Sequence, residues 1–280
     1  MSPDPQTAQA QPDLASPLAV AAQRDRSMPD IVRRAIARQD VLLAFQPVMS
    51  VHSPEQPAFY EGLVRIMDET GRLIPAGDFI GTIEIDELGR RIDCLALEMG
   101  LISLGRDPKL RIAINMSARS IGYPAWLRML EDGLRADPTA GERLILEITE
   151  SSAMAMPDVV SAFMADVRGR GVCFALDDFG AAQTSLRHLR DFFFDILKID
   201  GQFIGGIAAS RDNQVLVQAL VSVARHFEMF TVAEAVETAA DAAFLAGIGI
   251  DGMQGYYFGA ASILPPWERA ARDRHAARAG

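Results

Sequence analysis

This sequence of 280 residues has little cysteine and no long apolar run. Its two cysteines, Cys94 and Cys173, lack the paired spacing of a zinc site or a disulfide framework. Cys173 lies in an apolar run, so we expect a buried, reduced thiol, as in a cytoplasmic protein. No apolar run approaches the roughly 18–20 residues of a membrane span. The N-terminus lacks the basic and apolar regions of a secretory signal. These absences predict a cytoplasmic chain without a membrane span.

Basic residues are also fewer than acidic ones, 27 against 37, which gives a net charge of −10. This excludes a broad face for duplex nucleic acid. A small anionic ligand remains possible where metal ions offset the acidic groups. The apolar fraction of 49% is enough to fill a sizeable core, and the length suits one large α/β barrel or two modest domains.

Lysine is the rarest basic residue: of 27 basic residues, only Lys109 and Lys198 are lysines. Lys198 ends the strand-like segment DILKI, where a surface charge is out of place. A lysine can lose its proton when it is buried or lies beside other cations, whereas arginine cannot. We therefore interpret Lys198 as a proton-handling residue, with pairing to a core carboxylate as the structural alternative.

Strand and helix patterns alternate along most of the chain. Residues 1–27 have no sustained period and predict a disordered tail or linker. A helix is expected over 29–38, and the pattern favours pairing of the strands 41–50 and 57–66 as a hairpin. Further strands are expected at 110–117, 143–149, 172–177, 195–199, 230–236 and 252–258. Helices are expected at 79–104, 125–135, 157–170, 213–227 and 239–246. This alternation predicts a closed parallel β/α barrel over residues 28–270, followed by a basic tail at 271–280.

Six of these strand-like segments end on carboxylate, amide or amine groups. The residues are Glu61, Asn115, Glu147, Asp177 with Asp178, Lys198 and Glu234. Because the carboxyl ends of barrel strands meet at one mouth, we expect these side chains to share a site. Their oxygens suit Mg²⁺ or Mn²⁺, and the absence of His and Cys disfavours zinc.

Adjacent Asp177 and Asp178 carry further information. Neighbours in a regular strand point to opposite faces, but where the strand ends the chain turns and both can face the mouth. One carboxylate could then bridge two ions about 3.5–4 Å apart, an arrangement suited to in-line attack on a phosphodiester. The structural alternative is that the acids cap the following helices. Asn115 and Lys198 do not fit that alternative.

Eight short motifs, in order from Phe45 to Gly259, resemble those of the EAL family of cyclic di-GMP phosphodiesterases. They are FQPV, EGLVR, INMS, EITES, DDFG, LKID, AEAVE and QGYYFG. The resemblance implies a modified TIM (β/α)8 barrel whose first strand is antiparallel. It also implies hydrolysis of cyclic di-GMP to linear pGpG with two Mg²⁺ or Mn²⁺ ions, and assembly as a homodimer.

The resemblance also implies a role for each site residue. Glu61, Asn115, Glu147 and Asp177 would bind the first metal, and Asp177, Asp178 and Glu234 the second. Lys198 would orient and help to deprotonate the attacking water, with its pKa lowered by the two cations. Gln46 and Arg65 would contact substrate. Gln254 and Glu237 would lie near the water and the substrate, and Glu150 would anchor the loop after DDFG.

The sequence departs from the family at several supporting positions. Gly62 replaces the Ala of EAL, and Ala182 and Ala235 stand where the family has Gly. A cyclic di-GMP receptor or protein-interaction module with little turnover is therefore a second hypothesis, and a purely structural barrel a third. The run Phe192 to Phe194 is expected in the core, with a dimer contact as the alternative.

Overall fold

The structure is a computed structural model, and it describes residues 17–181 and 192–269. The predicted tail at 271–280, residues 1–16 and most of the loop after DDFG, including Ala182, lie outside the described residues.

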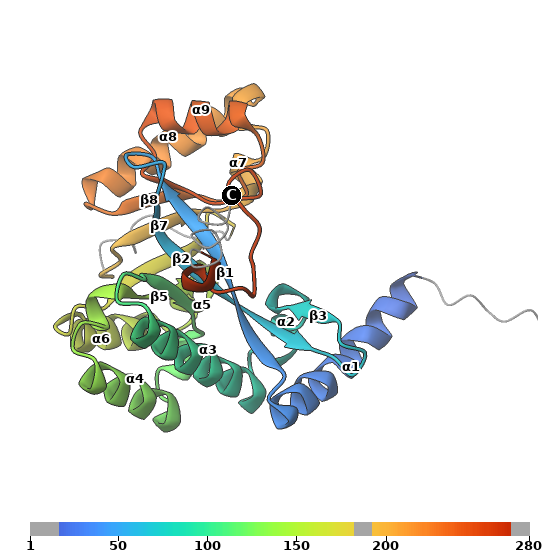
Figure 1. Ribbon diagram of the computed structural model, residues 1–280. Helices are drawn as coiled ribbons and strands as arrows, with labels where there is room; N and C mark the ends of the chain where they lie inside the picture. The colour runs from blue at the N-terminus through green and yellow to red at the C-terminus, as the bar shows by residue number, and fades with distance from the viewer. Residues whose placement is uncertain (1–16, 182–191, 270–280) are drawn as a thin grey trace, which may run out of the picture.

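A closed eight-stranded barrel forms the centre of the molecule (Figure 1). Its strands are β1 (Val41–Ser50), β2 (Pro57–Met67), β4 (Ile112–Asn115), β5 (Leu144–Thr149), β6 (Cys173–Phe179), β7 (Ile196–Ile199), β8 (Phe230–Ala233) and β9 (Gly252–Met253). β1 pairs antiparallel with both β2 and β9, and the other barrel strands are parallel to their neighbours. The modified barrel with an antiparallel first strand is therefore confirmed. A short strand, β3 (Leu73–Pro75), pairs antiparallel with the outer end of β2.

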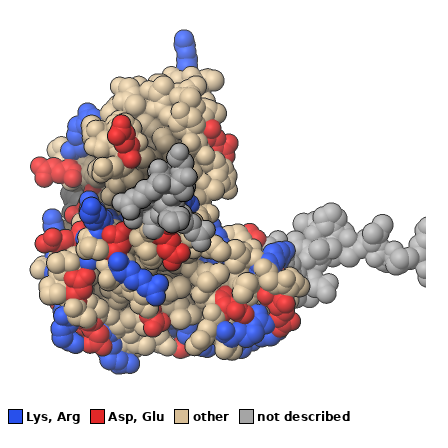
Figure 2. Space-filling view, viewed as in Figure 1, with Lys and Arg blue, Asp and Glu red and all other residues tan. Residues whose placement is uncertain are grey.

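Helices cover the outside of the barrel. They are α1 (Pro17–Arg38), α2 (Ile80–Ile83), α3 (Glu87–Arg106), α4 (Pro124–Ala136), α5 (Glu150–Ala155), α6 (Pro157–Arg168), α7 (Gly201–Ile204), α8 (Arg211–His226) and α9 (Ala239–Ile248). In Figure 1, α3, α4 and α6 lie on one side, α8 and α9 on the other, and α1 extends away beside α2 and β3. Figure 2 shows acidic and basic side chains intermingled on this face rather than separated by sign.

Three of the expected elements differ most clearly from the structure. The helix expected from residue 29 begins earlier, at Pro17, within the segment expected to be a tail. The helix expected over 79–104 is divided into α2 and α3, where Gly89 packs so closely that a Cβ would lie 2.7 Å from the Ile83 carbonyl oxygen. The last strand is only two residues long, since the chain turns at Gly255 against the backbone of Val236.

The inside of the barrel contains a small apolar layer to which seven strands each contribute one residue. The layer consists of Val48, Phe59, Ala113, Ile145, Ala175, Ile196 and Val232. Since side chains two residues apart in a strand point to the same face, the next inward position lies two residues further along. That period sets which residues reach the mouth.

Candidate active site

The strand period explains why the predicted residues converge. Glu61, Asn115, Glu147, Asp177, Lys198 and Glu234 each stand two residues after a member of the inner apolar layer. Gln46 stands two residues before Val48 instead, which is consistent with β1 running in the opposite direction. Strand pairing aligns Gln46 with Glu61 and Asn115 with Glu147. The barrel geometry therefore places these side chains in one tier at its mouth.

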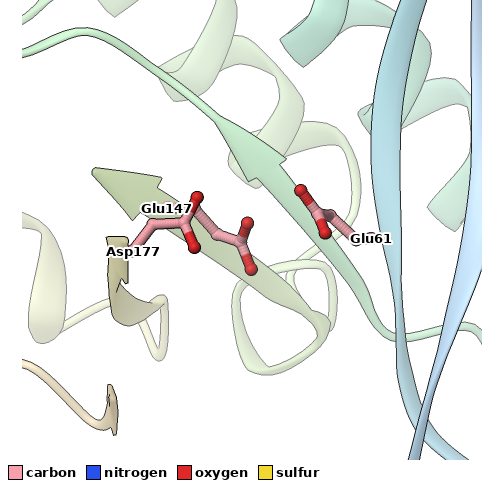
Figure 3. A group of neighbouring side chains, drawn as sticks. All are labelled: Glu61, Glu147 and Asp177. Atoms are coloured by element: carbon pink, nitrogen blue, oxygen red, sulfur yellow. The ribbon is translucent and has the colours of Figure 1, made fainter. Parts of the chain in front are cut away.

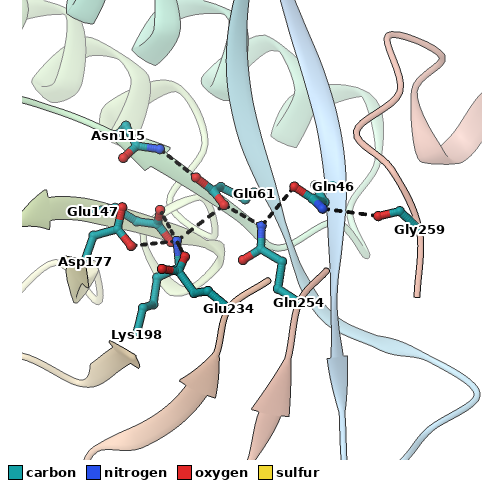
Figure 4. A network of polar contacts seen from close by, with 9 residues as sticks. All are labelled: Gln46, Glu61, Asn115, Glu147, Asp177, Lys198, Glu234, Gln254 and Gly259. Carbon is teal, nitrogen blue, oxygen red and sulfur yellow. Dashed lines mark hydrogen bonds and ion pairs between the residues drawn. The ribbon is translucent and has the colours of Figure 1, made fainter. Parts of the chain in front are cut away.

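Lys198 lies at the centre of this tier and is fully buried. Its Nζ is 2.9 Å from Asp177 Oδ1, 2.9 Å from Glu234 Oε1, 3.1 Å from Glu147 Oε2 and 3.3 Å from Glu61 Oε2 (Figure 4). The lysine is thus surrounded by four carboxylates from four strands or strand ends. The structural alternative, pairing with core carboxylates, describes this arrangement, and those carboxylates are also the predicted metal ligands.

Two overlapping groups of carboxylates could each hold a metal ion. Glu61, Glu147 and Asp177 offer oxygens that all lie within 4.8 Å of one another, and Figure 3 shows these three side chains close together. Asp177, Asp178 and Glu234 form the second group within the same limit. Asp177 belongs to both groups, which is the geometry that a bridging ligand requires.

Asp178 reaches the site because the backbone of β6 is irregular at this point. The pairing register between β6 and β7 shifts between Leu176 and Phe179, and Asp178 has φ 54°. Aspartate tolerates this left-handed region better than most residues do. The shift allows consecutive carboxylates to face the same space, as the sequence predicted for the end of a strand.

Amide side chains fix the orientation of Glu61. Asn115 Nδ2 donates to Glu61 Oε1 at 2.9 Å, and Gln254 Nε2 donates to Glu61 Oε2 at 2.5 Å. Gln254 Nε2 also lies 3.3 Å from Gln46 Oε1, and Gln46 Nε2 donates to the Gly259 carbonyl (Figure 4). Because Asn115 donates through its nitrogen, its carbonyl oxygen is left to face other groups.

The crowding of charge shifts the pKa values of the cluster. Burial alone would lower the pKa of Lys198, but the four carboxylates outweigh it and raise that pKa well above its usual range. Burial, together with the negative charge of Glu61 and Asp177, raises the pKa of Glu147 and brings that of Glu234 to about 8. Burial opposes ionisation of Glu61 as well, yet Lys198 and the amide donors keep its pKa lowered. The lowered pKa expected for Lys198 beside two cations stays a prediction.

The residues fit a pair of hard divalent cations. Asp178 adds a fifth carboxylate, its pKa raised to about 6 chiefly by burial and then by Asp177. One ammonium group therefore faces five acidic groups. Among the described residues, Glu147 Oε1 and Gln254 Oε1 are buried and accept no hydrogen bond. Buried oxygens without donors, in an acidic site, are what Mg²⁺ or Mn²⁺ would satisfy.

A cavity of about 550 Å³ opens beside the cluster. Its lining includes the residues predicted to contact substrate, Gln46, Arg65 and Glu237, together with Gln254 and most of the carboxylates. Glu150 lies outside it, where its Oε2 accepts a hydrogen bond from the Gly180 amide at 3.0 Å. That contact reaches the start of the loop after DDFG, and the role of Glu150 as its anchor stays a prediction.

Other residues of the site were not found from the sequence. Asp200, Gly201 and Tyr256 line the same cavity. Asp200 was detectable in principle, because it stands two residues after Lys198. A neighbouring cavity of about 430 Å³ includes Glu84 and Asp93. Asp93 was hidden within a helical pattern, and only the packing of α3 against the loop after β4 brings it to the site.

No helix in the described part of the chain is both long enough and apolar enough to cross a membrane. Cys94 and Cys173 are partly buried free thiols, so the fully buried position expected for Cys173 is not what the structure has. Phe192 and Phe194 are core residues, whereas Phe193 is 42% exposed.

Relatives with similar sequences cover most of this chain. It is 30% identical over 246 residues to the cyclic di-GMP phosphodiesterase NbdA of Pseudomonas aeruginosa, covering 86% of this chain and 31% of that protein. It is 30% identical over 240 residues to the signaling protein YkoW of Bacillus subtilis, covering 84% of this chain and 30% of that protein. The chain thus spans about a third of the length of these curated relatives.

Solved structures share the fold. The Pseudomonas aeruginosa FimX EAL domain bound to c-di-GMP superposes with a TM-score of 0.77 at 23% identity, covering 84% of this chain and 96% of that one. The MucR phosphodiesterase in complex with c-di-GMP has a TM-score of 0.74 at 29% identity, covering 87% of this chain and 99% of that one. A family model for the EAL domain matches residues 30–261. With the barrel, the acidic mouth and these matches together, the chain belongs to the EAL-domain family.

Proposed function

We propose that this chain hydrolyses cyclic di-GMP to linear pGpG with two Mg²⁺ or Mn²⁺ ions. Two sets of carboxylate side chains share Asp177, and both lie around the buried Lys198 beside a cavity of about 550 Å³. This arrangement is the observation that carries the proposal. The relatives named cyclic di-GMP phosphodiesterases support the substrate.

The position of each residue in the site suggests its role. Glu61, Asn115, Glu147 and Asp177 would hold one ion, and Asp177, Asp178 and Glu234 the other. When bound, the two ions would supply electrostatic stabilisation for in-line attack at the phosphodiester. Lys198, at the centre of both sets, would accept the proton of the attacking water, with Gln254 beside it. Arg65, Gln46 and Glu237 would orient the nucleotide, and Glu150 would hold the loop after DDFG.

A turnover assay tests the proposal. The protein is incubated with cyclic di-GMP and Mn²⁺, and pGpG is measured. Lys198→Ala should lower the rate by roughly 10²–10⁴, the usual loss when a general base is removed. Lys109→Ala is the matched control, since Lys109 is the other lysine and is exposed outside the cavity. No product from the unaltered protein over hours would reject the hydrolase.

A cyclic di-GMP receptor is the second candidate. The observation in its favour is that Lys198 pairs with four of the carboxylates, so that the cluster neutralises part of its own charge without cations. Micromolar binding of cyclic di-GMP without pGpG would establish this candidate. A homodimer, a regulatory protein partner and a cytoplasmic location stay proposals as well.

A further inference from the structure

The segment after β8 bends sharply at Ala235, directly beside the candidate ligand Glu234. Ala235 has φ 50°, in the left-handed region where a Cβ is unfavourable and glycine is the usual residue. Three other described non-glycine residues have φ in this region: Gln39, Asp178 and Glu228. Asp178 is in the same site, but aspartate tolerates this conformation, whereas alanine has no polar group to stabilise it.

Hydrogen bonds fix the backbone on both sides of the bend. The Glu234 amide donates to the Ile199 carbonyl at 3.2 Å, and the Val236 amide donates to the Gln254 carbonyl at 2.9 Å. Val236 is fully buried. Between these anchors the bend directs Glu234 toward Lys198, whose Nζ lies 2.9 Å from Glu234 Oε1. The position of the carboxylate therefore depends on the conformation of one residue.

Gly201, in the segment after β7, faces Ala235. A Cβ placed on Gly201 would lie 2.7 Å from the Ala235 Cβ but 4.0 Å from the Ala235 Cα. The first distance is a clash and the second is ordinary contact. Both residues line the cavity beside the carboxylates. The gap between the two segments thus has room for one methyl group, which Ala235 supplies.

We infer that Ala235 is a positioning residue for Glu234 and that Gly201 is its required counterpart. The methyl group of Ala235, packed against Gly201, limits the movement of the bend and so holds the Glu234 carboxylate near Asp177 and Lys198. The functional side of this inference rests on the proposed metal-dependent hydrolase.

Calorimetric titration with Mn²⁺ tests the inference on the full chain. Ala235→Gly removes no ligand, yet it should weaken Mn²⁺ binding roughly tenfold, as loss of an outer contact to a metal ligand typically does. Gly201→Ala should also weaken binding, because two methyl groups then compete for one space. The double variant, Ala235→Gly with Gly201→Ala, should restore affinity to within about threefold of the unaltered protein, since its single methyl lies at contact distance.

Glu228→Gly is the matched control. It relieves the same backbone conformation at the opposite end of β8, so it should leave Mn²⁺ affinity unchanged. Unchanged Mn²⁺ affinity in Ala235→Gly would overturn the positioning role. Failure of the double variant to recover would overturn the single-methyl explanation.

Urea unfolding of the metal-free protein separates this inference from the proposed function. Gly201→Ala should lower the unfolding midpoint when Ala235 is present and leave it unchanged in the Ala235→Gly background. Glu234→Gln should shift the unfolding midpoint less in the Ala235→Gly background than in the unaltered protein, because the carboxylate is then less firmly held. If the unaltered protein bound no Mn²⁺, the proposed function would fail while these two comparisons still decided the inference. Equal shifts in both backgrounds would overturn it.

Discussion

At the scale of single residues, the site is governed by burial of charge. Lys198 and Glu147 have no exposed surface, and Glu61 is 5% exposed. Charges in such an environment interact strongly and must be paired. Residues at the rim, such as Arg65, are partly exposed and therefore less coupled to the cluster. Substitutions of central residues should therefore disturb the pairing of the buried charges, whereas substitutions of rim residues should leave that pairing in place.

Arg65 provides a prediction at the rim. We expect Arg65→Ala to weaken cyclic di-GMP binding by about 1.5–3 kcal/mol, the value of a hydrogen bond to a charged group. Its Nη1 donates to the Val64 carbonyl and it lines the large cavity, but it belongs to neither carboxylate group. Mn²⁺ affinity should therefore stay within about twofold. Calorimetry with each ligand checks both, and a collapse of metal affinity would contradict the assigned role.

Asp93 provides a prediction about pH. Burial raises its pKa to about 7, although the Ser120 hydroxyl and the Ser117 amide donate to its carboxylate. In the unfolded chain the pKa is about 3.9, so the folded state binds the proton more tightly. This group therefore contributes stability below about pH 4, and the contribution is lost as pH rises toward 7.

Asp93→Asn removes this titration while keeping an oxygen to accept both hydrogen bonds. The free energy of unfolding of the variant, minus that of the unaltered protein, should rise from pH 5 to pH 8 by up to about 3 kcal/mol. Urea unfolding at the two pH values measures this. The same difference in unfolding free energy at both pH values would show that the Asp93 carboxyl does not titrate in this range.

At the scale of elements, glycines let the strands and helices approach closely. A Cβ on Gly62 of β2 would lie 2.8 Å from Ile114 Cδ1 and 3.0 Å from Leu43 Cδ2. A Cβ on Gly100 of α3 would also meet the Ile114 side chain, at 2.8 Å from Cγ1. Ile114 therefore fills the space that the methyl group of the family's usual alanine would need at position 62.

The prediction for this contact is a compensating pair. Gly62→Ala, which restores the family's usual residue, should destabilise the fold by roughly 1–3 kcal/mol through overpacking. Adding Ile114→Val removes the Cδ1 atom and should recover part of that loss. Urea unfolding of the two single variants and the double variant checks this, and strictly additive effects would contradict a direct contact.

At the scale of the whole molecule, metal binding at the acidic mouth would be coupled to folding. The carboxylates come from strands and loops between Glu61 and Glu234, so the unfolded chain cannot present them together. Free Mn²⁺ at 100 times its dissociation constant should therefore stabilise the fold by about 2.7 kcal/mol. Thermal unfolding with Mn²⁺ and with EDTA measures this. Glu61→Ala should lose most of the shift, and a full shift in that variant would contradict the proposed ligand set.

Assembly can be tested at an exposed aromatic side chain. Phe193 is 42% exposed and stands between two core phenylalanines in the chain. The guanidinium carbon of Arg168 lies 5.5 Å from the centre of its ring. If the homodimer forms through this region, Phe193→Asp should shift sedimentation from dimer to monomer. Circular dichroism provides the control for folding. A folded variant with unaltered sedimentation would exclude Phe193 from the contact.

The sequence by itself determined the fold family and which side chains meet at the mouth of the barrel. This was possible because the period of two along each strand, read with the motif order, specifies which side chains point to the mouth. Only the tertiary structure decided how those groups interact. Lys198 pairs with four carboxylates, Asp93 is buried beside the loop after β4, and Ala235 fits against Gly201. Each of these depends on segments distant in the chain meeting at specific distances, and local periodicity does not encode such distances.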